Sequence, residues 1–125
     1  MAAKILIVED DADLHLGLAL RLRSRGYEVL SAMDGIGALD VCDRTRPDLV
    51  LMDVGLPGMD GHTVARQLST RSDTCSVPVV YLTARHETRH RVEAATIGAA
   101  AYLVKPTTGD HLFAAIEAAL PENLH

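Results

Sequence analysis

The sequence has very few aromatic residues, and tryptophan is absent. Only 3% of its 125 residues are Phe, Trp or Tyr, whereas 48% are hydrophobic. The core must therefore be built from aliphatic side chains, a composition that suits an α/β protein. The length is that of one ordinary domain, so we expect residues 1–125 to form a single folded unit.

Cysteine is also scarce, and long apolar runs are missing. Cys42 and Cys75 are too few and too far apart for a disulfide framework or a zinc knuckle, which fits a reduced compartment. The longest apolar runs, such as Ile5 to Val8, are much shorter than a membrane span, and the first residues lack a signal-peptide pattern. We therefore expect a soluble, cytoplasmic protein with no membrane association.

Positive charge does not dominate any part of the chain. There are 12 Lys and Arg residues against 17 Asp and Glu residues, which gives a formal net charge of -5. A basic stripe that would neutralise a phosphate backbone is missing, so we expect no direct binding to nucleic acid.

Five short apolar runs alternate with longer amphipathic stretches, each run being followed by a candidate helix. The runs are apolar on both faces, which is typical of a parallel sheet that helices cover on both sides. The sequence therefore predicts a doubly wound α/β fold whose active crevice lies outside the carboxyl ends of the strands. The predicted strands are Lys4–Val8, Tyr27–Ser31, Leu49–Met52, Val79–Leu82 and Ala101–Val104.

The helix boundaries carry their usual signals. Asp11 is placed to cap the first helix, and Gly26 can adopt the left-handed conformation that ends it. Gly98 is expected to end the fourth helix in the same way, and Asp110 lies in the first turn of the last helix.

Acidic residues follow two of the predicted strands. Glu9 and Asp10 come after the first strand, and Asp53 comes after the third. If these strand ends are adjacent, the carboxylates repel one another, and a hard divalent cation relieves that repulsion. Mg²⁺ is the natural candidate because no soft ligand is near, with Mn²⁺ as an alternative. The backbone carbonyl of Gly55 offers a further oxygen ligand.

A hydroxyl and a cation end two other strands. Thr83 ends the fourth strand, and Lys105 ends the fifth, directly before Pro106, whose peptide bond is a candidate for the cis form. Phosphoryl transfer to a carboxylate requires a nucleophile, a metal ion and donors to the phosphoryl oxygens. The four strand ends together supply these groups.

The motifs closely resemble the signature of bacterial response-regulator receiver domains, in order and over essentially the whole chain. This resemblance implies a flavodoxin-like sheet with the strand order 2-1-3-4-5, which places the Glu9 strand beside the Asp53 strand. The matching motifs are Glu9-Asp10-Asp11, Asp53-Val-Gly-Leu-Pro-Gly-Met-Asp-Gly61, Leu82-Thr83-Ala84 and Tyr102-Leu-Val-Lys105-Pro106.

The resemblance also implies a chemistry for the site residues. Asp53 would accept a phosphoryl group from a histidine kinase or a histidine phosphotransfer protein. Asp10 would bind Mg²⁺ directly, Glu9 would reach it through water, and Lys105 would contact the phosphoryl group. Such a domain is a phosphoacceptor that catalyses its own phosphorylation and slow dephosphorylation, and is not an enzyme acting on an external substrate.

The resemblance further implies a switch that controls an output. Thr83 would move toward the phosphoryl group and Tyr102 would turn inward, so that the surface formed by the fourth helix, the fifth strand and the last helix is remodelled. That surface would act on an output protein or an output domain, since none is expected within residues 1–125. A phosphorylation-dependent homodimer is a further candidate state, and the cognate kinase, stimulus and phosphoryl lifetime stay open.

Two rival patterns predict other functions. The segment His86-Glu87-Thr88-Arg89-His90 matches the zinc-peptidase pattern, but it lacks a third ligand and is expected at the exposed start of a helix. Gly35-Ile36-Gly37 gives only part of a dinucleotide-binding fingerprint. The remaining histidines are isolated and are expected at the surface or in packing: His15, His62, His111 and His125.

Overall fold

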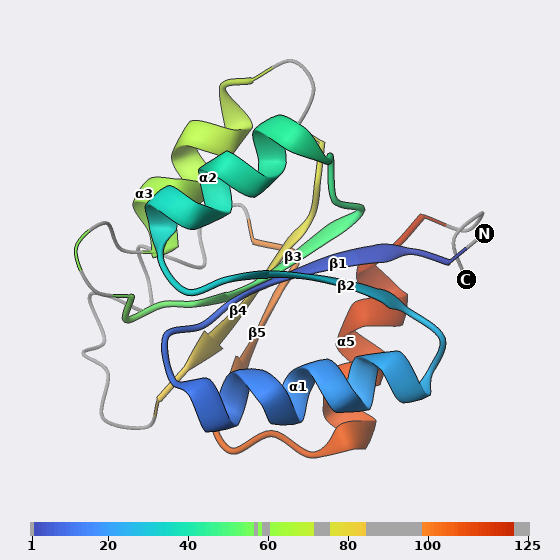
Figure 1. Cartoon of the computed structure of the whole chain (residues 1–125). Helices are drawn as coiled ribbons and strands as arrows, with labels where there is room; N and C mark the ends of the chain where they lie inside the picture. The colour runs from blue at the N-terminus through green and yellow to red at the C-terminus, as the bar shows by residue number, and fades with distance from the viewer. Residues whose placement is uncertain (1, 57, 59–60, 72–75, 85–98, 122–125) are drawn as a thin grey trace.

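Five parallel strands form one sheet in the order β2-β1-β3-β4-β5 (Figure 1). The computed structural model describes residues 2–56, 58, 61–71, 76–84 and 99–121. The strands are β1 (Lys4–Val8), β2 (Glu28–Ala32), β3 (Leu49–Asp53), β4 (Val79–Thr83) and β5 (Ala101–Val104). The helices of the described part are α1 (Ala12–Ser24), α2 (Gly35–Arg44), α3 (Gly61–Ser69) and α5 (Gly109–Ala119). The predicted doubly wound, flavodoxin-like fold and its strand order are confirmed.

Helices cover both faces of the sheet (Figure 1). Alternate residues of a strand point to opposite faces, so Ile5 and Ile7 of β1 pack in the cluster with α1 and α5. Leu6 and Val8 pack on the other side, in the cluster with α2 and α3. The central strands β1 and β3 are apolar on both faces for this reason, as the sequence predicts.

The edge strand β5 is less buried than its apolar sequence predicts. Ala101 and Leu103 pack toward the cluster that contains α5, whereas Tyr102 and Val104 are 53% and 44% exposed. The exposed pair alternates with the packed pair because successive side chains of a strand leave opposite faces. One face of β5 therefore carries apolar side chains that solvent can reach.

The residues that the sequence predicts at helix ends and turns have the expected conformations in the structure. The Asp11 side chain accepts a hydrogen bond from the Leu14 amide at 3.0 Å and caps α1. Gly26 has a φ of 85°, the left-handed conformation predicted for the residue that follows this helix. The Lys105–Pro106 peptide bond is cis. Gly98 lies outside the described residues.

The predicted strand boundaries differ from the observed ones by one residue at most. Strand β2 begins and ends one residue later than predicted, while β3 and β4 each extend by one residue, to Asp53 and Thr83. The last two differences matter, because both polar residues are thereby held in the hydrogen-bonded sheet.

The structure can be compared with two expectations, one about the cysteines and one about the short apolar runs. Cys42 is buried on α2 and packs as a core residue, whereas Cys75 is outside the described part. Within the described residues, every helix is too short or too polar to cross a membrane.

Candidate functional site

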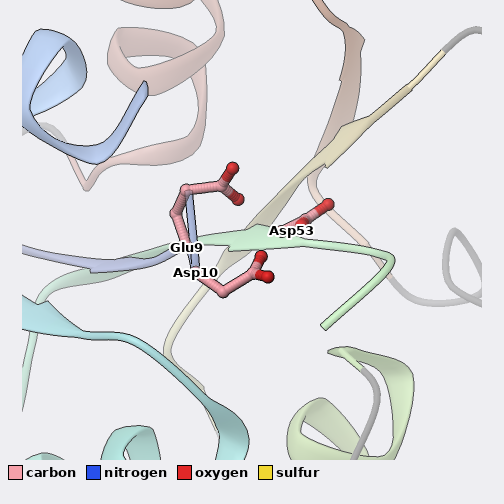
Figure 2. A group of neighbouring side chains, drawn as sticks. All are labelled: Glu9, Asp10 and Asp53. Atoms are coloured by element: carbon pink, nitrogen blue, oxygen red, sulfur yellow. The ribbon is translucent and has the colours of Figure 1, made fainter. Parts of the chain in front are cut away.

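Three carboxylates converge at the carboxyl ends of β1 and β3. These strands are neighbours with Val8 opposite Met52, so the residues that follow in each strand also lie side by side. One carboxylate oxygen from each of Glu9, Asp10 and Asp53 lies within 4.8 Å of the others (Figure 2). Glu9 and Asp53 are buried, whereas Asp10 is exposed. The predicted adjacency of the acids is therefore confirmed.

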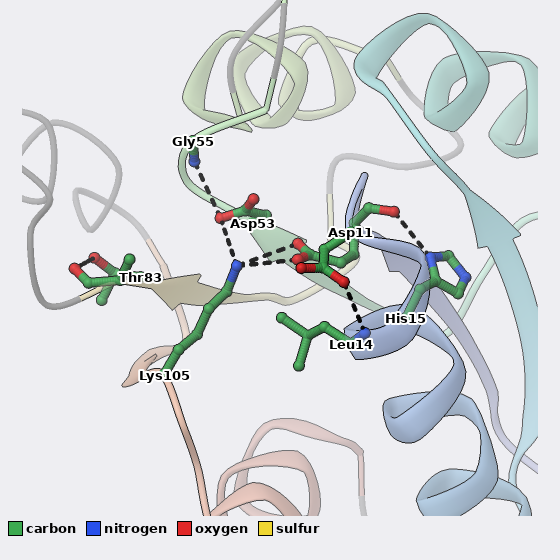
Figure 3. A network of polar contacts seen from close by, with 9 residues as sticks. Asp11, Leu14, His15, Asp53, Gly55, Thr83 and Lys105 are labelled. Atoms are coloured by element: carbon green, nitrogen blue, oxygen red, sulfur yellow. Dashed lines mark hydrogen bonds and ion pairs between the residues drawn. The ribbon is translucent and has the colours of Figure 1, made fainter.

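The Lys105 ammonium group lies between two of these acids (Figure 3). Its Nζ is 3.1 and 3.3 Å from the two carboxylate oxygens of Glu9, and 3.3 Å from Oδ1 of Asp53. The backbone holds the residue in place, because the Lys105 amide donates to the Thr83 carbonyl at 2.8 Å. The Lys105 ammonium, which follows β5, thus pairs with two buried carboxylates, that of Glu9 after β1 and that of Asp53 at the end of β3.

The turn after β3 orients the Asp53 side chain. The amide of Gly55 donates to Oδ1 of Asp53 at 3.1 Å, and the amide of Val54 donates to the Leu82 carbonyl at 2.9 Å. Oδ1 therefore receives two donors, the Gly55 amide and the Lys105 ammonium (Figure 3). The role of the Gly55 carbonyl as a metal ligand stays a prediction.

The pKa of Glu9 is raised to about 7. Burial is the main cause, repulsion from Asp53 adds to it, and Lys105 opposes both. For Lys105 the balance is different: burial lowers its pKa, but attraction to Asp53 and the bond to Glu9 outweigh burial and raise it. The lysine thus stays charged, and it offsets only part of the burial and repulsion that raise the pKa of Glu9.

Thr83 and Tyr102 lie close to this cluster in the sheet but are not part of it. The Thr83 hydroxyl is buried and donates to the Ala84 carbonyl at 3.3 Å, whereas the Tyr102 ring is exposed. Thr83 pairs with Val104, two residues from Tyr102 along β5. The structure therefore brings together Glu9, Asp10, Asp53 and Lys105, and places Thr83 and Tyr102 on the neighbouring strands.

Gly61 is a site residue whose role the sequence reading missed. A Cβ at this position would lie 2.6 Å from the Asp53 carbonyl oxygen and 3.3 Å from the Met52 side chain. The sequence analysis names Gly61 only as the last residue of a matching motif, and its spacing does not reveal that the first residue of α3 packs closely against the backbone of Asp53. Only a residue without a side chain fits this contact.

His15 is a second residue that the sequence reading undervalued. It was expected at the surface or in packing, and it is buried on α1. Its Nδ1, however, lies 3.0 Å from the carbonyl oxygen of Glu9, which is a residue of the acidic cluster. The sequence signal for this contact is the spacing, because His15 follows Glu9 by six residues and lies one turn into α1.

The described residues give no support to the two rival functions, zinc-dependent peptide cleavage and dinucleotide binding. His86 and His90 of the zinc-peptidase pattern lie outside them. Gly35 and Gly37 form the first turn of α2, where the Asp34 side chain accepts a hydrogen bond from the Gly37 amide at 2.7 Å. That turn is closed by the chain's own carboxylate, which is a helix cap and not a phosphate cradle.

The site geometry agrees with comparisons to known proteins. A model of the response regulator receiver domain family matches residues 5–117. The chain belongs to this family. Receiver domains of response regulators are signalling domains that interact with histidine kinases and output domains. The chain spans about a quarter to a half of the length of the curated relatives it matches.

Three relatives illustrate the similarity of this receiver domain to known ones. Response regulator PleD of Caulobacter vibrioides is 42% identical over 117 residues, which cover 93% of this chain and 26% of that protein. The signal receiver domain of a histidine kinase from Syntrophus aciditrophicus has a TM-score of 0.87 at 32% identity, covering 95% and 90% of the two chains. The receiver domain of sensor histidine kinase PA1611 from Pseudomonas aeruginosa, solved with a magnesium ion coordinated in its active site cleft, has a TM-score of 0.85 at 32% identity, covering 94% and 96%.

We predict that Gly61→Ala destabilises the receiver domain by about 1–3 kcal/mol, because the new methyl group forces the Asp53 carbonyl to move. Gly17→Ala on α1 is the matched control. Apart from its own stretch of helix backbone, no atom lies within 4 Å of the added methyl group, so helix propensity should stabilise this variant by up to about 1 kcal/mol. Urea unfolding of both variants checks this, and equal stabilities would contradict the contact.

We predict that the stability of the metal-free domain falls as the pH rises from 5 to 8, because the folded pKa of Glu9 is above its unfolded value. The stabilising contribution is full below the unfolded pKa and is lost as the pH rises through about 7. Relative to Glu9→Gln, the wild type should lose about 1–3 kcal/mol over this range. Chemical unfolding in EDTA measures the difference, and parallel pH profiles would contradict the raised pKa.

Proposed function

We propose that residues 1–125 form a phosphoacceptor switch in which Asp53 takes a phosphoryl group from a phosphohistidine of a histidine kinase or a phosphotransfer protein. The observation that carries this proposal is the setting of the Asp53 carboxylate. It is buried, it lies 3.3 Å from the Lys105 ammonium, and two further carboxylates are within 4.8 Å. A nucleophile beside a fixed positive charge and a set of hard oxygen donors is what phosphoryl transfer requires.

The donor set fits Mg²⁺, and Mn²⁺ can use the same oxygens. Asp10 and Asp53 would bind the ion directly, the Gly55 carbonyl would add a backbone oxygen, and Glu9 would hold a bound water. When bound, the ion supplies positive charge that offsets the repulsion among the acids and the charge of the incoming phosphoryl group. The magnesium ion in the related PA1611 domain supports this assignment.

The chain's own groups determine the transfer step. A carboxylate oxygen of Asp53 forms a bond to phosphorus as the phosphorus–nitrogen bond to the donor imidazole breaks, and the electron pair of that bond stays on the imidazole. Lys105 already faces Asp53, so its ammonium can pair with a phosphoryl oxygen without a large rearrangement. Water later attacks the phosphorus slowly, which breaks its bond to the Asp53 oxygen, releases inorganic phosphate and regenerates the carboxylate.

The output would depend on Thr83 and Tyr102. In this structure the Thr83 hydroxyl makes a long bond to its neighbour's carbonyl, so a phosphoryl oxygen on Asp53 can compete for it. Because the Thr83 carbonyl binds the Lys105 amide, movement at the end of β4 is passed to β5, which carries the exposed Tyr102. The remodelled β5 and α5 surface would then engage an output protein, an output domain or a second copy of the chain.

We predict that acetyl phosphate and Mg²⁺ add one phosphoryl group to the wild type, and that mass spectrometry places it on Asp53. EDTA should abolish the adduct, because the acids then lack their cation. Asp53→Asn should remove it, whereas Asp110→Asn, an exposed acid of α5, should leave it intact as the matched control. An undiminished adduct in Asp53→Asn would overturn the proposal.

We predict that the Thr83→Ala variant is still phosphorylated on Asp53 but transmits much less of the resulting change to β5. At an equal extent of phosphorylation, the backbone resonances of β5 should shift in the wild type and much less in Thr83→Ala, because the hydroxyl that senses the phosphoryl group is missing. Thr70→Ala, whose hydroxyl bonds the Gln67 carbonyl on α3, is the control. Heteronuclear NMR measures the shifts, and a full response in Thr83→Ala would refute the switch role.

A further inference from the structure

His15 makes one specific contact and is otherwise enclosed. The side chain is on α1 and is only 8% exposed. Its Nδ1 lies 3.0 Å from the carbonyl oxygen of Glu9. Because a carbonyl oxygen only accepts hydrogen bonds, Nδ1 must carry the proton and donate it. Nε2 is buried and has no hydrogen-bond partner among the described residues, so the bond to Glu9 is the polar contact that orients the ring.

The carbonyl that His15 binds belongs to the peptide between Glu9 and Asp10. A peptide group is planar and rigid, so fixing its oxygen fixes the plane from which both acidic residues continue. The amide of Glu9 is held on its other side, because it donates to the Ala32 carbonyl of β2 at 3.2 Å. The backbone of Glu9 is therefore fixed from β2 at its nitrogen and from α1 at its oxygen.

Asp10 depends on this backbone more than its neighbours do. Glu9 is held through its side chain by Lys105, and Asp53 is held by Lys105 and the Gly55 amide. Asp10 is exposed, and no hydrogen bond to its carboxylate is found in the described part of the chain. The hydrogen-bonded backbone that precedes Asp10 is consequently the part of the described structure that places the start of its side chain.

We propose that His15 is a positioning residue for the divalent cation: its Nδ1–H bond to the Glu9 carbonyl orients the Glu9–Asp10 peptide and so holds the Asp10 carboxylate toward the metal position. The inference rests on the proposed function, since it assumes that the acids bind Mg²⁺. Partners that orient metal ligands without touching the metal typically change affinity by about 10–100-fold when removed. A single backbone hydrogen bond places His15 near the lower end, at about tenfold.

Two substitutions at this position separate the hydrogen bond from packing. His15→Leu fills the buried volume but has no donor. His15→Asn restores a donor, because its side-chain NH₂ group can occupy the place of Nδ1–H. His111→Leu, the same change at an exposed position of α5, is the matched control. Unfolding by urea establishes that each variant is folded before any binding is measured.

Mg²⁺ affinity is measured by isothermal titration calorimetry of the metal-free protein. We expect His15→Leu to weaken binding about tenfold, while His15→Asn and His111→Leu stay within about threefold of the wild type. Wild-type affinity in His15→Leu would overturn the inference, and so would an equal loss in His15→Leu and His15→Asn, which would assign the effect to ring packing. If the wild type itself binds no Mg²⁺, the proposed function fails, and that result is distinct from either of these.

A second measurement needs no metal. A long-range ¹H–¹⁵N spectrum of the metal-free wild type is expected to show the His15 proton on Nδ1. A proton on Nε2 would overturn the inference even in a protein that binds Mg²⁺ normally.

Discussion

The charge balance at the carboxyl ends of β1 and β3 is the constraint on which the rest of the site depends, because there is a shortage of positive charge there. Glu9, Asp10 and Asp53 bring their carboxylates together, and Lys105 is the ammonium that pairs with the two buried ones. The shortage appears in the raised pKa of Glu9, whose burial beside Asp53 is only partly offset by the lysine. Burying carboxylates with too little positive charge beside them lowers stability, which is common at functional sites.

The parallel sheet is what allows this arrangement. Parallel strands end at the same edge, so the ends of β1, β3 and β5 bring Glu9, Asp10, Asp53 and Lys105 together, and Thr83 ends the strand that lies between β3 and β5. The central strands are buried on both faces, which fixes their register and keeps the backbone beneath the acids rigid. Apolar packing on both faces of the sheet therefore supports the backbone that carries the charged residues.

Most of the fold and the grouping of the acidic residues could be predicted from the sequence, for identifiable physical reasons. Double-sided apolar runs specify parallel strands, and Asp11 and Gly26 mark helix ends through local bonds that involve only neighbouring residues. The grouping of Glu9, Asp10 and Asp53 follows once β1 and β3 are known to be neighbours. What pattern reading missed depends on contacts between distant segments. The closeness of Gly61 to the Asp53 carbonyl and the bond from His15 to the Glu9 carbonyl are of this kind, as is the exposure of Tyr102 on an edge strand.

The contact of Gly61 with Asp53 has a mechanical consequence. Because a Cβ at residue 61 would lie only 2.6 Å from the Asp53 carbonyl oxygen, the start of α3 must pack closely against the peptide of Asp53. Helix α3 is thus part of the fixed frame that supports the nucleophile. Hydrogen bonds join the same region to the rest of the sheet, because the Val54 amide donates to Leu82 of β4 and the Lys105 amide donates to Thr83 at the end of that strand. The backbone at Asp53 is therefore supported both by close packing against α3 and by the hydrogen bonding of its own sheet.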